Sequence, residues 1–351
     1  MENQDSKPQR RVRYKGTHPK SFKEKYKELQ PDKYTADVEK IMQKGNTPAG
    51  MHRSVCMNEI LEILNIKPGQ TGLDATLGYG GHSLEMLKCL MPGGKLFAID
   101  VDPIELPRTR ERLLSLGFGA GVADIRKMNF SDIDQITNEV GELNFILADL
   151  GVSSMQIDNP ERGFSVKTDG PLDLRLNPQS GKSAAALLKI ISKKELEILL
   201  IENADEPHAE IIAQTILSKI KKGVLIENTL QLKALIKEAL ELTTVNGEVD
   251  IDELKKTCAR CFQALRIAVN DEFGVLDKFL QKLPDALASG GRVAILTFHS
   301  GEDRRVKKAF QLYFREGIFS SVAPDPIRPS AEEIFSNPRA RSAKLRWAIK
   351  A

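Results

Sequence analysis

The chain has 351 residues, too many for one small domain and about right for two. Hydrophobic residues make up 41% and charged residues 28% of it, which supports a sizeable core and excludes a chain that is disordered throughout. The net charge is only +3, and residues 1–30 alone hold nine basic and four acidic side chains, so a global positive field is excluded.

Cysteine content and hydropathy indicate the compartment. Four cysteines in 351 residues do not make a disulfide framework. No stretch of ~18 apolar residues could span a membrane, and the basic, polar N-terminus lacks the apolar segment of a secretory signal. We therefore expect a soluble, cytoplasmic protein with no membrane partner.

Residues 1–46 are expected to form a basic, flexible extension. They are charged and poor in large apolar residues, so they have little surface to bury. The ordered body is expected to begin near Met51, because apolar residues from Val55 to Leu64 recur at helical spacing. Pro68 and Gly69 then end this helix.

Residues 51–157 alternate between strand and helix patterns. The predicted elements are a strand over 71–76, a glycine turn over 77–83, a helix over 84–91, a strand over 95–100, a helix over 103–117 and a strand over 143–151. The last strand is apolar on both faces, as the strands of a parallel sheet are. The pattern predicts an α/β fold.

Residues 158–258 interrupt this pattern. They show helical stripes but no convincing strand, and a strand returns only over 292–298. One crossover helix, expected over about residues 262–283, accounts for only part of that gap. We therefore predict a helical domain inserted over 158–258. Residues 259–351 are expected to form the second part of the α/β domain and to end in a basic C-terminal segment.

The densest group of chemistry-bearing residues is "DATLGYGGHS", residues 74–83. It follows a strand and opens a helix, where backbone N–H groups approach a ligand closely. A dinucleotide fingerprint would need glycine where the chain has Ser83, which weakens the case for NAD. Asp100 ends the next strand, where an acid accepts hydrogen bonds from ribose hydroxyls. S-Adenosylmethionine is therefore the better expected cofactor.

Several motifs resemble one known family. They include "DATLGYGGHS", "AIDVDP", "LADLGVSSMQIDNPERGFSVKTDGPLDLRL", "CFQALRIAVNDEF" and "GGRVAILTFHS". They occur in the order seen in the RsmH/MraW family, and the resemblance covers about residues 52–350. That family comprises bacterial enzymes that methylate N4 of a cytidine in 16S rRNA with S-adenosylmethionine. The resemblance implies a Rossmann-like methyltransferase fold with an inserted all-helical domain. It also implies 16S rRNA in the small ribosomal subunit as partner, and it leaves a homodimer open.

The resemblance also implies the site residues. Asp149 ends the strand over 143–151 and is expected to be catalytic, as the acceptor for the target amine, as well as a cofactor contact. Phe130 is expected to offer an apolar face to adenine. The expected cofactor-binding residues are Gly80, Gly81, His82, Asp100, Phe130, Asp149 and Gln156.

No metal site is expected. Cys258 and Cys261 form one pair without a second, so they are interpreted as packing thiols. His299, Glu302 and Asp303 straddle a strand-to-helix turn, where the two acids suit the first turn of a helix.

RNA contact has two expected footholds, the C-terminal segment and the helix after residues 292–298. Their basic side chains would neutralise phosphates without reading sequence. They are Arg339, Arg341, Lys344, Arg346 and Lys350 in the segment, and Arg304, Arg305, Lys307 and Lys308 in the helix.

Two departures from the family pattern leave a diverged paralogue open. They are Tyr79, where the family usually has glycine, and residues 254–261. Two functions of other classes are also weighed. One is a non-catalytic RNA-binding ribosome-assembly factor with the same fold. The other, disfavoured by Ser83, is an NAD-dependent oxidoreductase.

Overall fold

A computed structural model describes residues 54–244 and 246–351. The extension expected over residues 1–46 lies outside the described residues. Within the described ranges, no helix is long and apolar enough to cross a bilayer.

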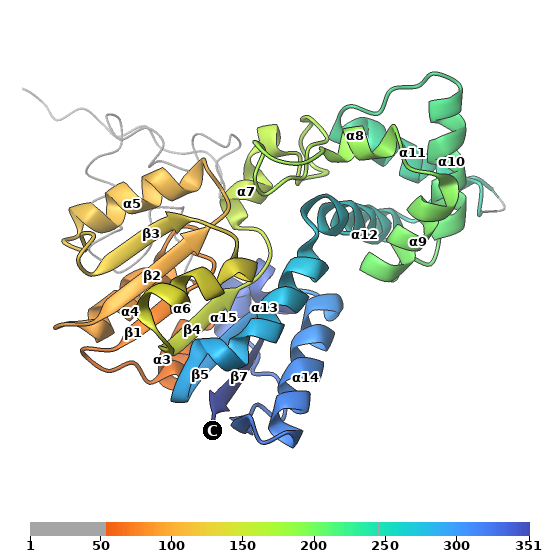
Figure 1. Ribbon diagram of the computed structural model, residues 1–351. Helices are drawn as coiled ribbons and strands as arrows, with labels where there is room; N and C mark the ends of the chain where they lie inside the picture. Colours follow the sequence, from red (N-terminus) through yellow and green to blue (C-terminus); the bar gives the residue numbers. More distant parts are fainter. Residues whose placement is uncertain (1–53, 245) are drawn as a thin grey trace, which may run out of the picture. The chain divides into compact units, whose positions relative to one another are not determined.

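A seven-stranded sheet with the order β3-β2-β1-β4-β5-β7-β6 organises the fold (Figure 1). Strands β1 to β5 pair in parallel, whereas β7 pairs antiparallel with both β5 and β6. The strands are β1 Thr71–Asp74, β2 Lys95–Asp100, β3 Ala123–Lys127, β4 Leu143–Asp149, β5 Leu287–Thr297, β6 Phe319–Val322 and β7 Lys344–Lys350. This Rossmann-like α/β sheet confirms the predicted fold class.

Helices cover both faces of the sheet. Successive side chains of a strand point to opposite faces, so each parallel strand contributes apolar residues to two separate cores. In β4, Ile146 and Ala148 join the core packed by α13 and α14, whereas Phe145 and Leu147 join the core packed by α3 and α4. The helices of the sheet domain are α3 Met57–Leu64, α4 Gly81–Leu90, α5 Glu105–Ser115, α6 Asp134–Val140, α13 Glu272–Ala286, α14 Ser300–Arg315 and α15 Ala331–Ser336.

Three strands, β3, β6 and β7, and two helices, α6 and α15, were not predicted from the sequence. Strand β3 reads A-D-I-R-K, and its last four residues are partly exposed or exposed because it lies at the edge of the sheet. An edge strand needs fewer apolar residues than a central one, so it gives a weak sequence signal.

The segment between β4 and β5 forms a helical insert with its own core (Figure 1). As predicted, the described residues in 158–257 form no strand, and only an isolated bridge joins Pro171 to Asn228. The helices are α7 Ser154–Asp158, α8 Ala184–Leu188, α9 Lys193–Ala204, α10 Ala209–Lys221, α11 Thr229–Glu241 and α12 Ile251–Asn270. Because Phe262 and Leu265 of α12 belong to this core, we place the end of the insert at Asn270 rather than at residue 258.

The single crossover helix expected over residues 262–283 was wrong. The structure has two helices there, α12 and α13, which meet at Asp271 in the left-handed conformation, with φ +48°. The Asn270 side chain holds the break, since it donates to the Leu174 carbonyl at 2.8 Å and accepts from the Leu176 N–H at 2.7 Å. Apolar spacing continues through this point, so periodicity alone does not reveal the break.

Cys258 and Cys261 lie in the core of the insert, and each side chain is about 1% exposed. Replacing both by alanine is expected to lower the free energy of unfolding by about 1–2 kcal/mol, because small apolar groups leave a packed core. Urea unfolding followed by circular dichroism measures this change. Release of bound zinc on substitution would instead show that the pair is a metal ligand.

Candidate active site

The carboxyl ends of four neighbouring strands place three aspartates and a histidine at one edge of the sheet. Asp74, Asp100 and Asp149 are the last residues of β1, β2 and β4, and His299 follows β5. The chain runs from β1 to β2 on one side of the sheet and from β4 to β5 on the other side, so the strand order reverses between the neighbours β1 and β4. Open α/β sheets bind ligands at such a crevice.

The glycine turn between β1 and α4 needs its glycines. Gly78 and Gly80 have φ values of +47° and +67°, in the left-handed region. A Cβ on Gly80 would also lie 2.9 Å from Cγ2 of Thr109, so a larger side chain would be both strained and crowded. Helix α4 begins at Gly81, and the first N–H groups of a helix have no intrahelical acceptor. The turn therefore offers donors to a ligand.

Asp100 organises this turn from the end of β2. Its Oδ2 accepts the Gly78 N–H at 2.8 Å, and its Oδ1 accepts the Asp102 N–H at 2.9 Å. Burial raises the pKa of this carboxyl, while the two N–H donors counteract the rise. Each oxygen keeps a second lone pair, so Asp100 has capacity left for a hydroxyl ligand.

The ring of His82 points into the protein interior, where it is 6% exposed. Its Nε2 lies 3.0 Å from the Val55 carbonyl oxygen, and its Nδ1 lies 3.6 Å from Oδ2 of Asp149. Burial lowers the pKa of the imidazole, so the neutral form is favoured. With the ring so engaged, the group that His82 offers at the glycine turn is its backbone N–H in the first turn of α4.

Asp149 has an unusual environment for a carboxylate. Its N–H donates to Oγ1 of Thr76 at 2.6 Å, but its Oδ1 is buried without a hydrogen-bond partner. Burial, and then the charge of Glu302, raise the pKa of Asp149 to about 7. Its neighbour Asp74 accepts the Ser83 hydroxyl at 2.6 Å, and burial raises the pKa of that carboxyl to about 6. Asp149 is therefore poised to gain or lose a proton near neutral pH.

Gln156 reaches the loop after β2 from the capping box of α7. Its Oε1 accepts the Ser153 N–H at 2.8 Å, and its Nε2 donates to Oδ2 of Asp102 at 2.7 Å. The structure therefore brings Gln156 next to the loop that contains Asp100 and Asp102, and its expected contact with the cofactor stays a prediction.

The sequence analysis missed the partner of Gln156, a buried ion pair between Asp102 and Arg162. Arg162 Nη1 donates to Asp102 Oδ2 at 2.7 Å, and the two side chains are 5% and 1% exposed. The guanidinium also donates to the Leu176 carbonyl at 2.7 Å. Asp102 lies in the motif "AIDVDP", and Arg162 lies in the long motif that contains "PERGFS". The two residues are 60 positions apart, and nothing in the sequence shows that their side chains form a pair.

Phe130 lies in a short 3₁₀ helix, Phe130–Asp132, after β3. Its ring meets the Phe279 ring edge-on, with centroids 5.1 Å apart and planes at 71°. Phe130 is only partly buried at the margin of the core. Its expected contact with adenine stays a prediction.

Glu272, His299 and Glu302 are the one group in the described residues whose ligand atoms could hold a metal ion. Arg266 donates to both oxygens of Glu272, at 2.8 and 3.0 Å. Glu302 lies 3.1 Å from Nε2 of His299, and its other oxygen accepts the Phe298 N–H at 2.8 Å. We interpret the group as an ion-pair network, because Arg266 already supplies a positive charge.

The basic side chains of the C-terminal segment are largely paired with groups of the protein itself, and their expected role in RNA contact stays a prediction. Asp303 accepts from Arg346 at 2.6 Å and from Lys344 at 2.7 Å, because β7 lies beside β5 and so close to the start of α14. Arg339 pairs with Asp158, and Lys350 donates to the Pro284 carbonyl. On α14, Arg305 pairs with Asp277 at 3.1 Å. The other three basic residues named above, Arg304, Lys307 and Lys308, are exposed, and Arg304 lies 3.9 Å from Asp205, which is also exposed.

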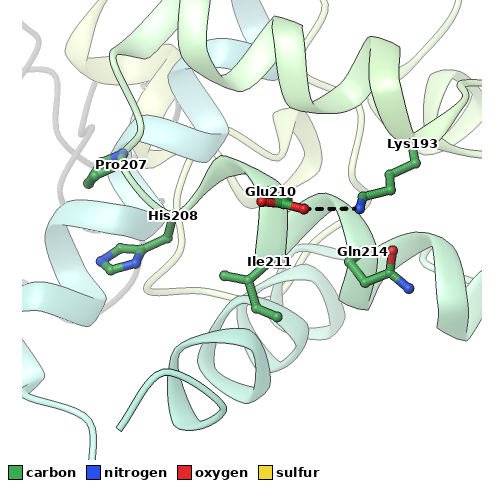
Figure 2. A pocket seen from close by; sticks show the side chains of 6 residues that line it. All are labelled: Lys193, Pro207, His208, Glu210, Ile211 and Gln214. Carbon is green, nitrogen blue, oxygen red and sulfur yellow. Dashed lines mark hydrogen bonds and ion pairs between the residues drawn. The ribbon is translucent and has the colours of Figure 1, made fainter.

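A surface pocket of about 550 Å³ lies on the insert, and Figure 2 shows the residues that line it. Lys193 and Glu210 form an ion pair at 3.5 Å across it, and both side chains are exposed. It is lined only by residues of the insert: Lys193, Pro207, His208, Glu210, Ile211 and Gln214. None of the expected site residues contributes to it.

Comparisons with known proteins identify the family of this chain. The MraW methylase family model matches residues 49–351 and leaves residues 1–48 unmatched. Ribosomal RNA small subunit methyltransferase H 2 of Alkaliphilus metalliredigens is 67% identical over 100% of both chains. Methyltransferase H 1 of Lachnoclostridium phytofermentans is 62% identical over 100% of this chain and 95% of its own. Methyltransferase H of Halorhodospira halophila is 38% identical over 86% of this chain and 94% of its own.

Arg162→Ala is expected to lower the free energy of unfolding by about 3–5 kcal/mol, because it leaves the Asp102 charge buried without its partner. Arg162→Ala combined with Asp102→Asn is expected to cost less than the sum of the two single changes. Denaturant unfolding of the three variants measures the coupling. Additive costs would mean that the pair contributes little.

Asp149→Asn is expected to raise the free energy of unfolding by about 2 kcal/mol above pH 7, because the neutral amide avoids burying a charge. The folded-state pKa of Asp149 is raised to about 7, so its proton stabilises the fold below the ordinary carboxyl pKa, and this contribution is lost as pH rises to about 7. The gain should therefore fade on acidification. Unfolding curves at several pH values measure it, and a gain independent of pH would contradict the prediction.

Proposed function

Because the chain belongs to the MraW methylase family, we propose that it methylates N4 of a cytidine in 16S rRNA of the small ribosomal subunit. The observation that carries the proposal is the unpaired, buried Oδ1 of Asp149 at the end of β4, beside the glycine turn.

S-Adenosylmethionine is the proposed cofactor, and it would supply an electrophilic methyl group. Asp100 would accept the ribose hydroxyls, and the N–H groups at Gly81 and His82 would face the cofactor from the start of α4. Gln156 would close the site from α7, and Phe130 would pack on adenine. Ser83 donates to Asp74, in the position where a dinucleotide fingerprint has glycine, so NAD is disfavoured.

The target amine sets the chemical demand on Asp149. The lone pair of cytidine N4 is delocalised into the ring, so the amine needs alignment with the methyl group and an acceptor for its N–H bonds. Asp149 would supply that acceptor at the carboxyl end of β4. The base must leave its stack to reach this crevice, so a rigid duplex would be a poor substrate.

RNA would be held in part by α14, whose Arg304, Lys307 and Lys308 are exposed close to His299 in the chain. Such contacts neutralise phosphates and weaken with salt. The rival function, a non-catalytic assembly factor, would not need an unpaired buried carboxyl beside a cofactor turn. The proposal places the enzyme in the cytoplasm, where small ribosomal subunits assemble.

Asp100→Ala is expected to weaken S-adenosylmethionine binding by about 1–3 kcal/mol, because hydrogen bonds to a charged acceptor are lost. Calorimetry with S-adenosylmethionine and with NAD measures the effect and separates the two cofactors. Unchanged affinity in a folded variant would rule out the ribose assignment.

Asp149→Ala is expected to abolish methyl transfer to small subunits isolated from a deletion strain. Cys258→Ala with Cys261→Ala should stay active in the same assay, because attack by an exocyclic nitrogen needs no covalent adduct with a thiol. Mass mapping of the rRNA identifies the modified base. An active Asp149→Ala enzyme would contradict the proposed role of the carboxylate.

A further inference from the structure

We propose that His82 and Asp149 act as one proton-accepting pair, in which Oδ2 of Asp149 takes the proton that leaves the target amine and the Nδ1 lone pair of His82 accepts a hydrogen bond from the resulting O–H. This inference rests on the proposed function and gives His82 a role in its side chain that differs from a cofactor contact. His82 is thus a positioning residue, since it acts on the substrate through Asp149. The pair is built from the start of α4 and the end of β4.

The hydrogen bond to Val55 fixes the tautomer of His82. A carbonyl oxygen can only accept, so the Nε2 that lies 3.0 Å from the Val55 oxygen must carry the ring proton. In the neutral ring, Nδ1 then has a lone pair and no proton. That lone pair lies 3.6 Å from Oδ2 of Asp149. Two lone pairs face each other until one proton enters between them.

The two oxygens of Asp149 have different surroundings. Its Oδ1 is buried and lacks a hydrogen-bond partner, so no donor stabilises negative charge there. The Asp149 side chain is nevertheless 28% exposed, and this exposure excludes Oδ1. Because Oδ1 is buried, we assign the proton-accepting role to Oδ2, the oxygen that lies 3.6 Å from His82.

The surrounding charges favour uptake of a proton. Asp74 at the end of β1 and Glu333 of α15 act on His82, and both raise its pKa against the opposing effect of burial. Glu302 of α14 raises the pKa of Asp149. The fourth titratable group is the Cys56 thiol, which burial keeps protonated, with its pKa raised to about 12. Among the described residues, the charged groups that act on the pair are thus three carboxyl groups, those of Asp74, Glu302 and Glu333.

The proposed step balances as follows. The N4 lone pair forms the bond to the methyl carbon, and the carbon–sulfur bond breaks with its electron pair going to sulfur. The cationic amine then loses a proton to Oδ2 of Asp149, and the resulting O–H points to the Nδ1 lone pair of His82. The products are the neutral methylated base, the thioether and a protonated pair, which returns its proton to water before the next turnover.

The test is His82→Gln, because glutamine keeps an N–H donor for the Val55 carbonyl but has no ring nitrogen facing Asp149. The Asp149 pKa should fall, so the acid limb of the kcat/KM profile should move to lower pH by about one unit, and kcat should fall about tenfold. S-Adenosylmethionine affinity should stay within about twofold. His208→Gln on the insert surface is the matched control and should change none of these values.

A second measurement does not depend on activity. The carboxyl carbon of Asp149, assigned through Asp149→Asn, is titrated by NMR in the full-length protein. Its midpoint should lie near neutral pH in the parent and lower in His82→Gln. An ordinary carboxyl midpoint in the parent, or weaker cofactor binding with an unmoved acid limb in the variant, would overturn the pair. If the midpoint of Asp149 behaves as proposed but the parent protein transfers no methyl group to small subunits, the proposed function is instead refuted.

Discussion

The buried ion pair between Asp102 and Arg162 is the interaction on which the geometry of the site depends. Asp102 follows β2, and Arg162 lies beyond α7, so the pair ties the loop after β4 to the loop after β2. Gln156 shares the same carboxylate oxygen, and Asp100 lies two residues away. A buried pair is costly to desolvate, but once formed it penalises any arrangement that separates its partners. The two loops are thereby held in register around the crevice.

Three aspartates at equivalent strand ends show how local donors set the chemistry of a carboxyl group. Asp100 accepts two backbone N–H groups, and Asp74 accepts a hydroxyl and a backbone N–H. Asp149 has a buried oxygen with no donor at all. The same residue type in the same place on the sheet can therefore bind a hydroxyl, hold a turn or take up a proton. The difference lies in the loops and helices that follow each strand.

The local features of this site could be predicted from sequence, whereas its long-range pairings could not. The runs that form β1, β2 and β4 are apolar enough to mark central strands, and Gly78 and Gly80 mark the turn because only glycine fits there easily. The direction of the His82 ring depends on Val55 and Asp149, which are far from it in sequence. Likewise, the sequence suggested Arg346 as an RNA contact, but in β7 its side chain donates a hydrogen bond to Asp303.

The independent core of the insert bears on how the chain folds. Strands β4 and β5 are neighbours in the sheet, yet residues 150–286 separate them in the chain. Closing a flexible loop of that length costs about 2 kcal/mol more than closing one of ten residues. A helical unit with its own core can hold its two ends close together once it has formed, and β5 then has only a short span to search before it pairs with β4. The insert thus lowers the effective contact order of the sheet that it interrupts.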